Sequence, residues 1–107
     1  MNIDFIRQAV VSNKYEVSQH AERERLNDDL SIVDIENAIQ TGEIIEDYPD
    51  DPRGASCLVL GWASDDRPVH LVVGFLPNGW IRIVTVYVPE PRKWEPDWKT
   101  RKRGGRK

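Results

Sequence analysis

Residues 67–88 read RPVHLVVGFLPNGWIRIVTVYV, two runs of β-forming residues joined by a turn that contains Asn78 and Gly79. Asn-Gly between two such runs is a strong signal for a β-hairpin. A connecting loop of two or four residues sets His70 across from Tyr87, whereas an odd-length loop would move them to opposite faces. The stretch therefore predicts two antiparallel strands with a polar pair at one end.

The two faces of this hairpin differ in polarity. The even loop also pairs Leu76 with Ile81, which divides the side chains into a mixed face and a uniformly apolar one. The mixed face holds His70, Val72, Gly74, Ile81, Ile83, Thr85 and Tyr87, and the apolar face holds Val69, Leu71, Val73, Phe75, Val84 and Val86. We expect helices on the apolar face and a pocket at the polar end of the other. A hydrogen-bonded structural histidine would also explain His70.

The sequence around the hairpin predicts an α+β fold. Helical apolar spacing runs through 3–12 and 31–42, and Ser18 can cap a short helix between them, after an extended link at 14–17. Strands are expected over 43–48, 55–63, 69–76 and 80–88. Because the connections are short, neighbouring strands can pair as a meander. We expect two to three N-terminal helices packed on a four-stranded antiparallel sheet.

Composition indicates one globular domain. The chain has 107 residues, of which 39% are hydrophobic and 31% charged. Its single cysteine, Cys57, excludes an internal disulfide and a cysteine-rich zinc site, and it is typical of the reducing cytoplasm. Residues 1–11 do not resemble a signal peptide, and no run is long enough to span a membrane. We expect a cytoplasmic protein without a membrane partner.

Charge is distributed unevenly along the chain. Residues 99–107 carry +6, whereas residues 1–98 carry 9 basic and 18 acidic side chains. We interpret residues 1–98 as a single domain and residues 99–107 as a flexible basic tail that could bind a polyanion. A tail that lies back on the acidic body is the alternative. The segment PEPRKWEPDWKT, residues 89–100, reads as an irregular arm docked through its two tryptophans.

The segment SQHAERER, residues 18–25, contains the second candidate histidine. On a helix, Arg23 and Glu24 share the face of His20, whereas Arg25 lies about 140° away. Glu24 could orient or acidify the imidazole, and Arg23 could hold an anion beside it. Arg25 shares this face only if the helix begins late or distorts near Ser18. Surface ion pairs within the segment are the alternative explanation.

Four ordered blocks resemble the DUF4258 family of small bacterial and archaeal proteins. The blocks are SQHAERERL, TGEIIEDYPDDPRGASCLVLG, RPVHLVVGF and IVTVYVPEPRKW, and the resemblance covers about residues 15–98. It implies similarity to the barnase, colicin and RelE-like ribonuclease folds, which include toxins of toxin–antitoxin pairs. It also implies a small antitoxin partner of the zinc-finger type.

Carried onto this chain, the resemblance implies an active site that cleaves RNA without metal or cofactor. Its catalytic residues are His20, His70 and Tyr87, and its phosphate-binding residues are Thr85 and one of Arg23 and Arg25. Many relatives have an arginine where this chain has Glu24, so the choice between the two arginines stays open. Such cleavage needs a base for the 2′-hydroxyl, an acid for the 5′-oxygen and donors for the phosphate. Histidine, tyrosine, threonine and arginine provide these groups.

Two functions therefore compete. The first is a metal-independent ribonuclease toxin, whose acidic body suits RNA presented by the ribosome better than RNA in general. The second is a non-catalytic module on the same fold that binds protein or nucleic acid, with the basic tail and the tryptophans as its contacts. A metal hydrolase is the weakest candidate, because the sequence has no HExxH or comparable spacing.

Overall fold

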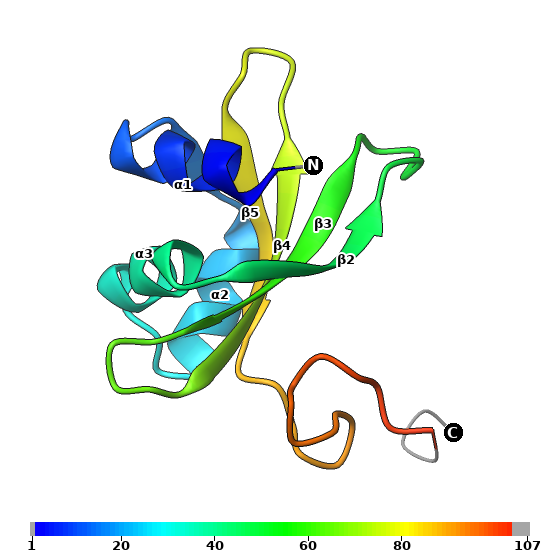
Figure 1. Cartoon of the computed structure of the whole chain (residues 1–107). Helices are drawn as coiled ribbons and strands as arrows, with labels where there is room; N and C mark the ends of the chain where they lie inside the picture. The colour runs from blue at the N-terminus through cyan, green and yellow to red at the C-terminus, as the bar shows by residue number, and fades with distance from the viewer. Residues whose placement is uncertain (1, 104–107) are drawn as a thin grey trace.

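The computed structural model describes residues 2–103, which form three helices and a five-stranded sheet (Figure 1). The helices are α1 (Ile3–Val11), α2 (Gln19–Asn27) and α3 (Ile32–Gln40). The strands are β1 (Tyr15–Val17), β2 (Glu43–Tyr48), β3 (Ser56–Trp62), β4 (Pro68–Phe75) and β5 (Ile81–Tyr87), in the order β1-β5-β4-β3-β2. Residues 88–103, the C-terminal arm, follow β5 and lie beyond the lower end of the sheet in Figure 1. The predicted α+β class is confirmed.

The prediction of a four-stranded antiparallel sheet is wrong in one respect. Residues 15–17, interpreted as a link, form strand β1, which pairs in parallel with Ile81–Ile83 of β5. β2 to β5 pair antiparallel in sequence order, as the meander requires. Three residues are too few to show an alternating pattern, so the sequence of β1 did not distinguish it from a link.

The β4–β5 register keeps His70 across from Tyr87 and Val72 across from Thr85, as predicted. The predicted pair at the turn is wrong, because Phe75 pairs with Ile81 across a loop of odd length. A β-bulge between the Val72 and Val73 pairs shifts the register by one residue and restores the predicted pairing beyond it. Ile81 and Ile83 consequently lie in the hydrophobic core instead of beside His70.

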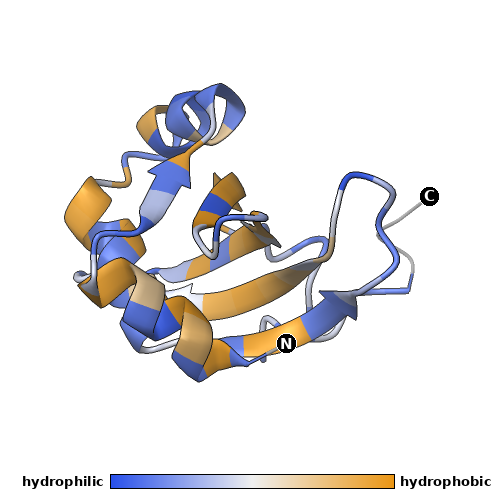
Figure 2. Ribbon diagram, turned by 90° about the horizontal axis from the view of Figure 1, so that it is seen from above, coloured by the Kyte–Doolittle hydropathy of each residue, from blue (hydrophilic) through white to orange (hydrophobic). Residues whose placement is uncertain are grey.

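The core lies between the sheet and the helices. It joins side chains of all three helices to the inner faces of the strands, including Ile6, Ala21, Ile35, Ile39, Val59, Leu71, Ile83 and Val86. Viewed from above, the strands are largely hydrophobic, and the helices present mixed faces (Figure 2). Ser31 and Asp34 form the predicted capping box of α3, and the Asp34 carboxylate also accepts hydrogen bonds from Ser64 in the β3–β4 turn.

Helix α2 runs along the edge of β5 and satisfies backbone groups that β1 is too short to pair. The Ser18 hydroxyl donates to the Val84 carbonyl at 2.9 Å, and the Glu24 carboxylate accepts the Val86 N–H at 2.9 Å. The Asp28 carboxylate accepts the N–H of the residue that follows β5, Val88, at 2.8 Å. Glu24 and Asp28 are four residues apart, a rise of about 6 Å along a helix, and Val86 and Val88 are two residues apart, about 6.7 Å along a strand. The two carboxylates are therefore spaced to match the two backbone N–H groups. The helix that carries His20 is thereby fixed beside β5.

Gly61 is expected to tolerate no side chain. A Cβ built on Gly61 would lie 1.8 Å from the Ala38 carbonyl oxygen of α3, whereas one on Gly74 would meet its nearest atom at 3.5 Å. Gly61→Ala should therefore lower the free energy of unfolding by about 3 kcal/mol or more, because helix and strand must separate. Urea denaturation against Gly74→Ala as control tests this expectation. Equal stability of the two variants would contradict the packing described.

Candidate active site

A cavity of about 800 Å³ lies where α2, the end of β5 and the C-terminal arm meet. Its charged and polar lining includes Glu24 of α2, Asp28 at the C-terminal cap of that helix, Tyr87 of β5, and Lys93, Arg101 and Lys102 of the arm. We call it the Tyr87 cavity. One predicted catalytic residue thus opens onto a cavity with basic side chains.

His70 lies behind Tyr87 and is fully buried. Its Nε2 lies 2.7 Å from the Trp98 carbonyl oxygen, and its Nδ1 lies 3.1 Å from the Tyr87 hydroxyl. Because a carbonyl only accepts, Nε2 carries the proton, and Nδ1 of the neutral ring accepts from the hydroxyl. In this state the Tyr87 oxygen can only accept a hydrogen bond from the cavity. His70 therefore reaches a ligand through Tyr87.

Burial keeps this pair uncharged at neutral pH. Desolvation lowers the pKa of His70 and raises the pKa of Tyr87. For the imidazole, the hydrogen bond to the Trp98 carbonyl and the charge of Glu46 act in the opposite direction, and the charge of Arg101 adds to the effect of burial. Desolvation is the largest contribution and decides the direction.

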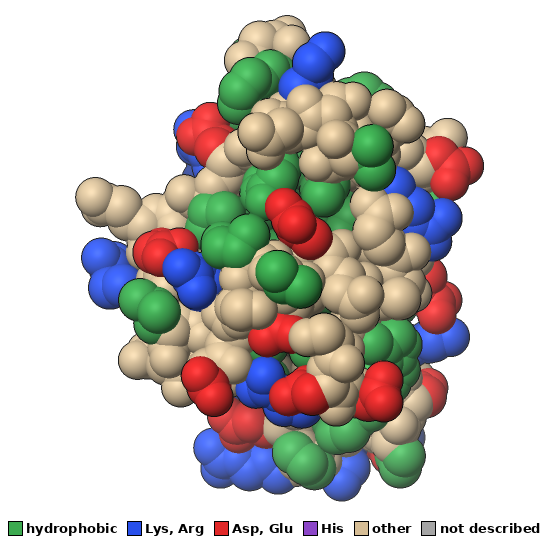
Figure 3. Space-filling view, turned by 90° about the vertical axis from the view of Figure 1, so that its left-hand side faces the viewer, with side chains coloured by type: hydrophobic (Ala, Val, Ile, Leu, Met, Phe, Trp, Pro, Cys, Tyr) green, Lys and Arg blue, Asp and Glu red, His purple; other side chains and the backbone are tan. Residues whose placement is uncertain are grey.

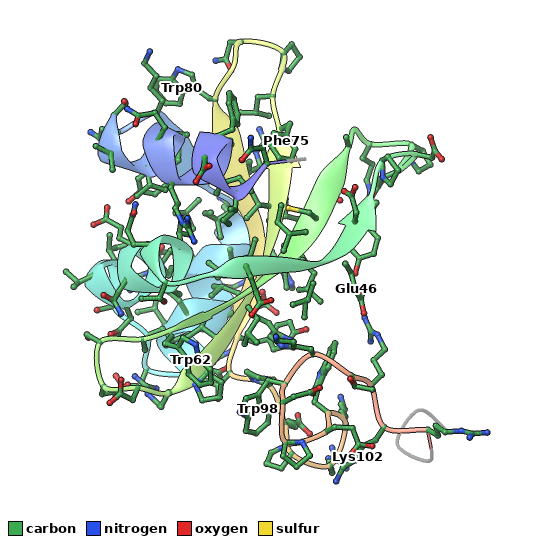
Figure 4. All side chains as sticks on the ribbon, viewed as in Figure 1. Glu46, Trp62, Phe75, Trp80, Trp98 and Lys102 are labelled. Carbon is green, nitrogen blue, oxygen red and sulfur yellow. The ribbon has the colours of Figure 1, made fainter. Side chains whose placement is uncertain are left out.

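The C-terminal arm creates this buried environment. Trp94 is 3% exposed and packs edge-on against His70, with 4.4 Å between ring centroids. The Arg101 guanidinium lies 4.6 Å from the centroid of Trp94 and donates hydrogen bonds of 3.1 and 3.0 Å to the Glu46 carboxylate. Figure 4 shows Glu46 extending from β2 toward the arm that carries Trp98 and Lys102. The predicted docking of the arm is confirmed for the side chain of Trp94, whereas Trp98, the second predicted anchor, contacts His70 through its backbone carbonyl.

The first residues of the basic tail also contact the acidic body. Lys99 Nζ lies 3.1 Å from the Glu43 carboxylate, and Arg101 pairs with Glu46. Residues 99–103 therefore follow the alternative in which the tail lies back on the domain. Residues 104–107, the remainder of the predicted flexible tail, lie outside the described part of the chain.

His20 occupies the exposed side of α2. Its side chain is 61% exposed, and its Nε2 lies 3.3 Å from one oxygen of Glu24, whose other oxygen accepts the Val86 N–H. His20 and Thr85 line a second cavity, of about 460 Å³. Glu24 lines the Tyr87 cavity and touches His20, so it connects the two parts of the site.

The structure separates the two candidate arginines. Arg25 donates two hydrogen bonds to Glu22, at 2.9 and 2.6 Å, and one to the Leu30 carbonyl at 3.1 Å. Its side chain is 16% exposed, and it lines a groove against the β3–β4 turn, away from His20. Arg23 is exposed and forms no salt bridge with any residue in 2–103. Of the two, only Arg23 is uncommitted.

The six predicted residues thus form two groups and two outliers. Tyr87 and His70 are in contact, and His20 and Thr85 share a cavity. Arg25 belongs to neither group, and Arg23 lines neither cavity. Both histidines lie within the described residues, and no hydrogen bond joins their rings. Neither is visible on the face formed by α1 and α3, where hydrophobic side chains gather among scattered charges (Figure 3).

Several functional candidates were missed by sequence reasoning. Glu24 was expected to orient or acidify the imidazole of His20, but its bond to the β5 edge was not foreseen. Glu46 and Arg101 are 55 residues apart in sequence, and no local pattern links them. Lys93 and Lys102 were not singled out, although the basic composition of this region was the available signal.

Residues 2–103 contain neither a cluster of metal ligands nor a membrane-spanning helix. No group of three or more His, Cys, Asp or Glu side chains is arranged to hold a metal ion in this part of the chain. None of its helices has the length and apolar character needed to cross a membrane.

Comparison with known proteins gives one match. A family model described as a domain of unknown function, DUF4258, matches residues 17–88. No curated protein and no solved structure matches the chain significantly. The match includes both histidines, Thr85 and Tyr87 and ends just before most of the C-terminal arm.

The burial of His70 predicts a pH-dependent stability. Its pKa is lower in the folded chain than the ordinary 6.5, so below that pH the unfolded state binds a proton that the folded state does not. The free energy of unfolding should fall as the pH is lowered from about 7.5 to about 5.5, a window above the carboxylate titrations. Urea denaturation should show a smaller fall for His70→Gln.

His20→Gln, which removes the exposed imidazole, is the control and should keep the fall seen in the unaltered chain. Nitrogen-15 NMR should show a protonated Nε2 and an unprotonated Nδ1 for His70 at neutral pH. An Nδ1-protonated ring, or the same pH dependence in His70→Gln, would contradict the assigned hydrogen bonds.

Proposed function

The chain belongs to the DUF4258 family, and we propose that it is a metal-independent endoribonuclease, acting in the cytoplasm as the toxin of a toxin–antitoxin pair. The observation that carries the proposed chemistry is the presence of two proton-handling pairs, His20–Glu24 on α2 and Tyr87–His70 on the strands β5 and β4, of which β5 lies beside α2. The toxin role and a zinc-finger antitoxin rest on the resemblance of the sequence alone.

Tyr87 and His70 act as the base. The Tyr87 oxygen accepts the proton of the ribose 2′-hydroxyl while its own proton passes to Nδ1 of His70, which lies 3.1 Å away. The 2′-oxygen bonds to phosphorus as the bond to the 5′-oxygen breaks, which leaves a 2′,3′-cyclic phosphate. Because burial lowers the pKa of His70, the imidazolium is short-lived and returns the proton afterwards.

His20 acts as the acid. The acid form is the imidazolium, in which both ring nitrogens carry a proton. Its Nε2–H donates to Glu24, which orients the ring, and its Nδ1–H protonates the departing 5′-oxygen, which leaves the neutral imidazole. Glu24 is itself held by the Val86 N–H, which fixes the imidazole relative to β5. His20 is assigned as the acid by elimination. The Tyr87 hydroxyl donates its proton to His70 in the resting state, so Tyr87 has no proton directed at the 5′-oxygen.

Phosphate contacts come from Thr85 and Arg23. Thr85 shares a cavity with His20 and supplies a hydroxyl donor. Arg23 is exposed and uncommitted within the described residues, whereas Arg25 is occupied by Glu22 and Leu30. A guanidinium at Arg23 can donate two hydrogen bonds to phosphate oxygens.

The alternative function is a non-catalytic module that binds protein or nucleic acid. The complete burial of His70 beneath the arm favours it, because a structural histidine with two hydrogen bonds needs no further role. The acidic body also disfavours RNA in general and limits an enzyme to RNA presented by a partner such as the ribosome.

Cleavage of RNA in EDTA tests the proposal. We expect the chain to cut ribosome-bound messenger RNA or a labelled single-stranded RNA, to leave 2′,3′-cyclic phosphate ends, and to spare the 2′-O-methyl form. His20→Ala and Tyr87→Phe should each lower kcat/KM by about 10²–10⁴-fold, because each removes one proton transfer.

Lys14→Ala, an exposed residue in the turn between α1 and β1, is the control and should cut RNA normally. Circular dichroism establishes that every variant is folded. Absence of cleavage on both substrates, or equal cleavage by the His20 and Tyr87 variants and the unaltered chain, would leave the binding module as the function.

A further inference from the structure

The C-terminal arm brings two lysines together at the Tyr87 cavity. Trp94 and Arg101 form an antiparallel bridge, and the Lys102 N–H donates to the Lys93 carbonyl at 2.9 Å. Both lysines line the cavity, although eight residues separate them in sequence. The bridge is anchored by buried Trp94 and by the Arg101–Glu46 ion pair. The positions of the two backbones are therefore fixed by the fold.

Each carboxylate of the cavity already has a partner. Glu24 accepts the Val86 N–H and lies against His20, and Asp28 accepts the Val88 N–H. Glu90 accepts from Arg92 at 2.7 Å, with the charge of Lys93 nearby. The acidic groups are thus engaged as hydrogen-bond acceptors.

The two lysines differ from the third basic residue of the cavity. The Arg101 guanidinium donates hydrogen bonds to Glu46 and lies over the ring of Trp94. Lys93 and Lys102 form no salt bridge with any other residue of the described range. They are the uncommitted positive charges beside Tyr87.

We propose that Lys93 and Lys102 form a phosphate-binding pair that holds the backbone of single-stranded RNA against Tyr87. The proposal rests on the ribonuclease function and extends its binding site beyond residues 17–88, the part that matches the family. Two ammonium groups at one wall contact adjacent phosphates and release their counterions. The body of the chain is acidic, so this pair supplies a local attraction for phosphate at the Tyr87 cavity.

Binding of a fluorescent 2′-O-methyl RNA 12-mer tests the pair without cleavage. Fluorescence anisotropy at several salt concentrations gives the slope of log K against log salt. For Lys93→Ala with Lys102→Ala, the magnitude of that slope should fall by about 1.4, and binding at low salt should weaken roughly tenfold, because two phosphate contacts are lost. Lys93→Arg with Lys102→Arg should retain the slope.

Lys14→Ala is the control, since it removes a positive charge from an exposed residue that does not line the cavity. An unchanged slope in the Lys93 and Lys102 alanine variant, an equal fall in the control, or no binding by the unaltered chain would each overturn the proposal. Binding with the expected slopes but no RNA cleavage would retain the lysine pair and remove the ribonuclease.

Discussion

The open edge of β5 is the constraint on which the site depends. β1 pairs only with Ile81–Ile83, so the remaining backbone groups of β5 need other partners. Helix α2 supplies them through side chains, of which Glu24 and Asp28 are one helical turn apart and meet Val86 and Val88. A buried strand edge without such partners would be costly. The helix therefore cannot slide along β5, and His20 is held in place with it.

The second constraint is the burial of His70. An imidazole removed from water needs a partner at each nitrogen, and Tyr87 and the Trp98 carbonyl provide them. The carbonyl belongs to the C-terminal arm, so the tautomer of a residue on β4 depends on a segment that follows β5. The hydrogen bond from Arg101 to Glu46 attaches the same arm to β2. The arm is in this sense part of the domain and of the site.

Sequence reasoning predicted the helices, the meander and the contact between His70 and Tyr87, but it reached that contact by a partly wrong argument. It assumed an even loop, whereas the structure contains an odd one, and it did not foresee the bulge that compensates for it. The odd loop and the bulge each shift the β4–β5 register by one residue, and the two shifts cancel at the end of the hairpin that carries His70 and Tyr87. Strand β1 and the Glu46–Arg101 pair were missed because neither follows a local period. The separation of Arg25 from the site depends on its bond to the Leu30 carbonyl, which no spacing rule describes.

Net charge is a poor guide to what the Tyr87 cavity can bind. The chain carries −3 overall and its first 98 residues carry −9, which argues against a polyanion as ligand. Charges in solution act over only about 8 Å at physiological ionic strength, so the nearest groups decide the local potential. There the carboxylates of Glu24 and Asp28 keep their charge but are held by backbone N–H groups, and the lysines of the arm are not paired within the described residues. Acidic and basic side chains are equally numerous in the lining of the cavity, whereas the first 98 residues carry twice as many acidic as basic ones, so the cavity is more favourable to phosphate than the composition implies.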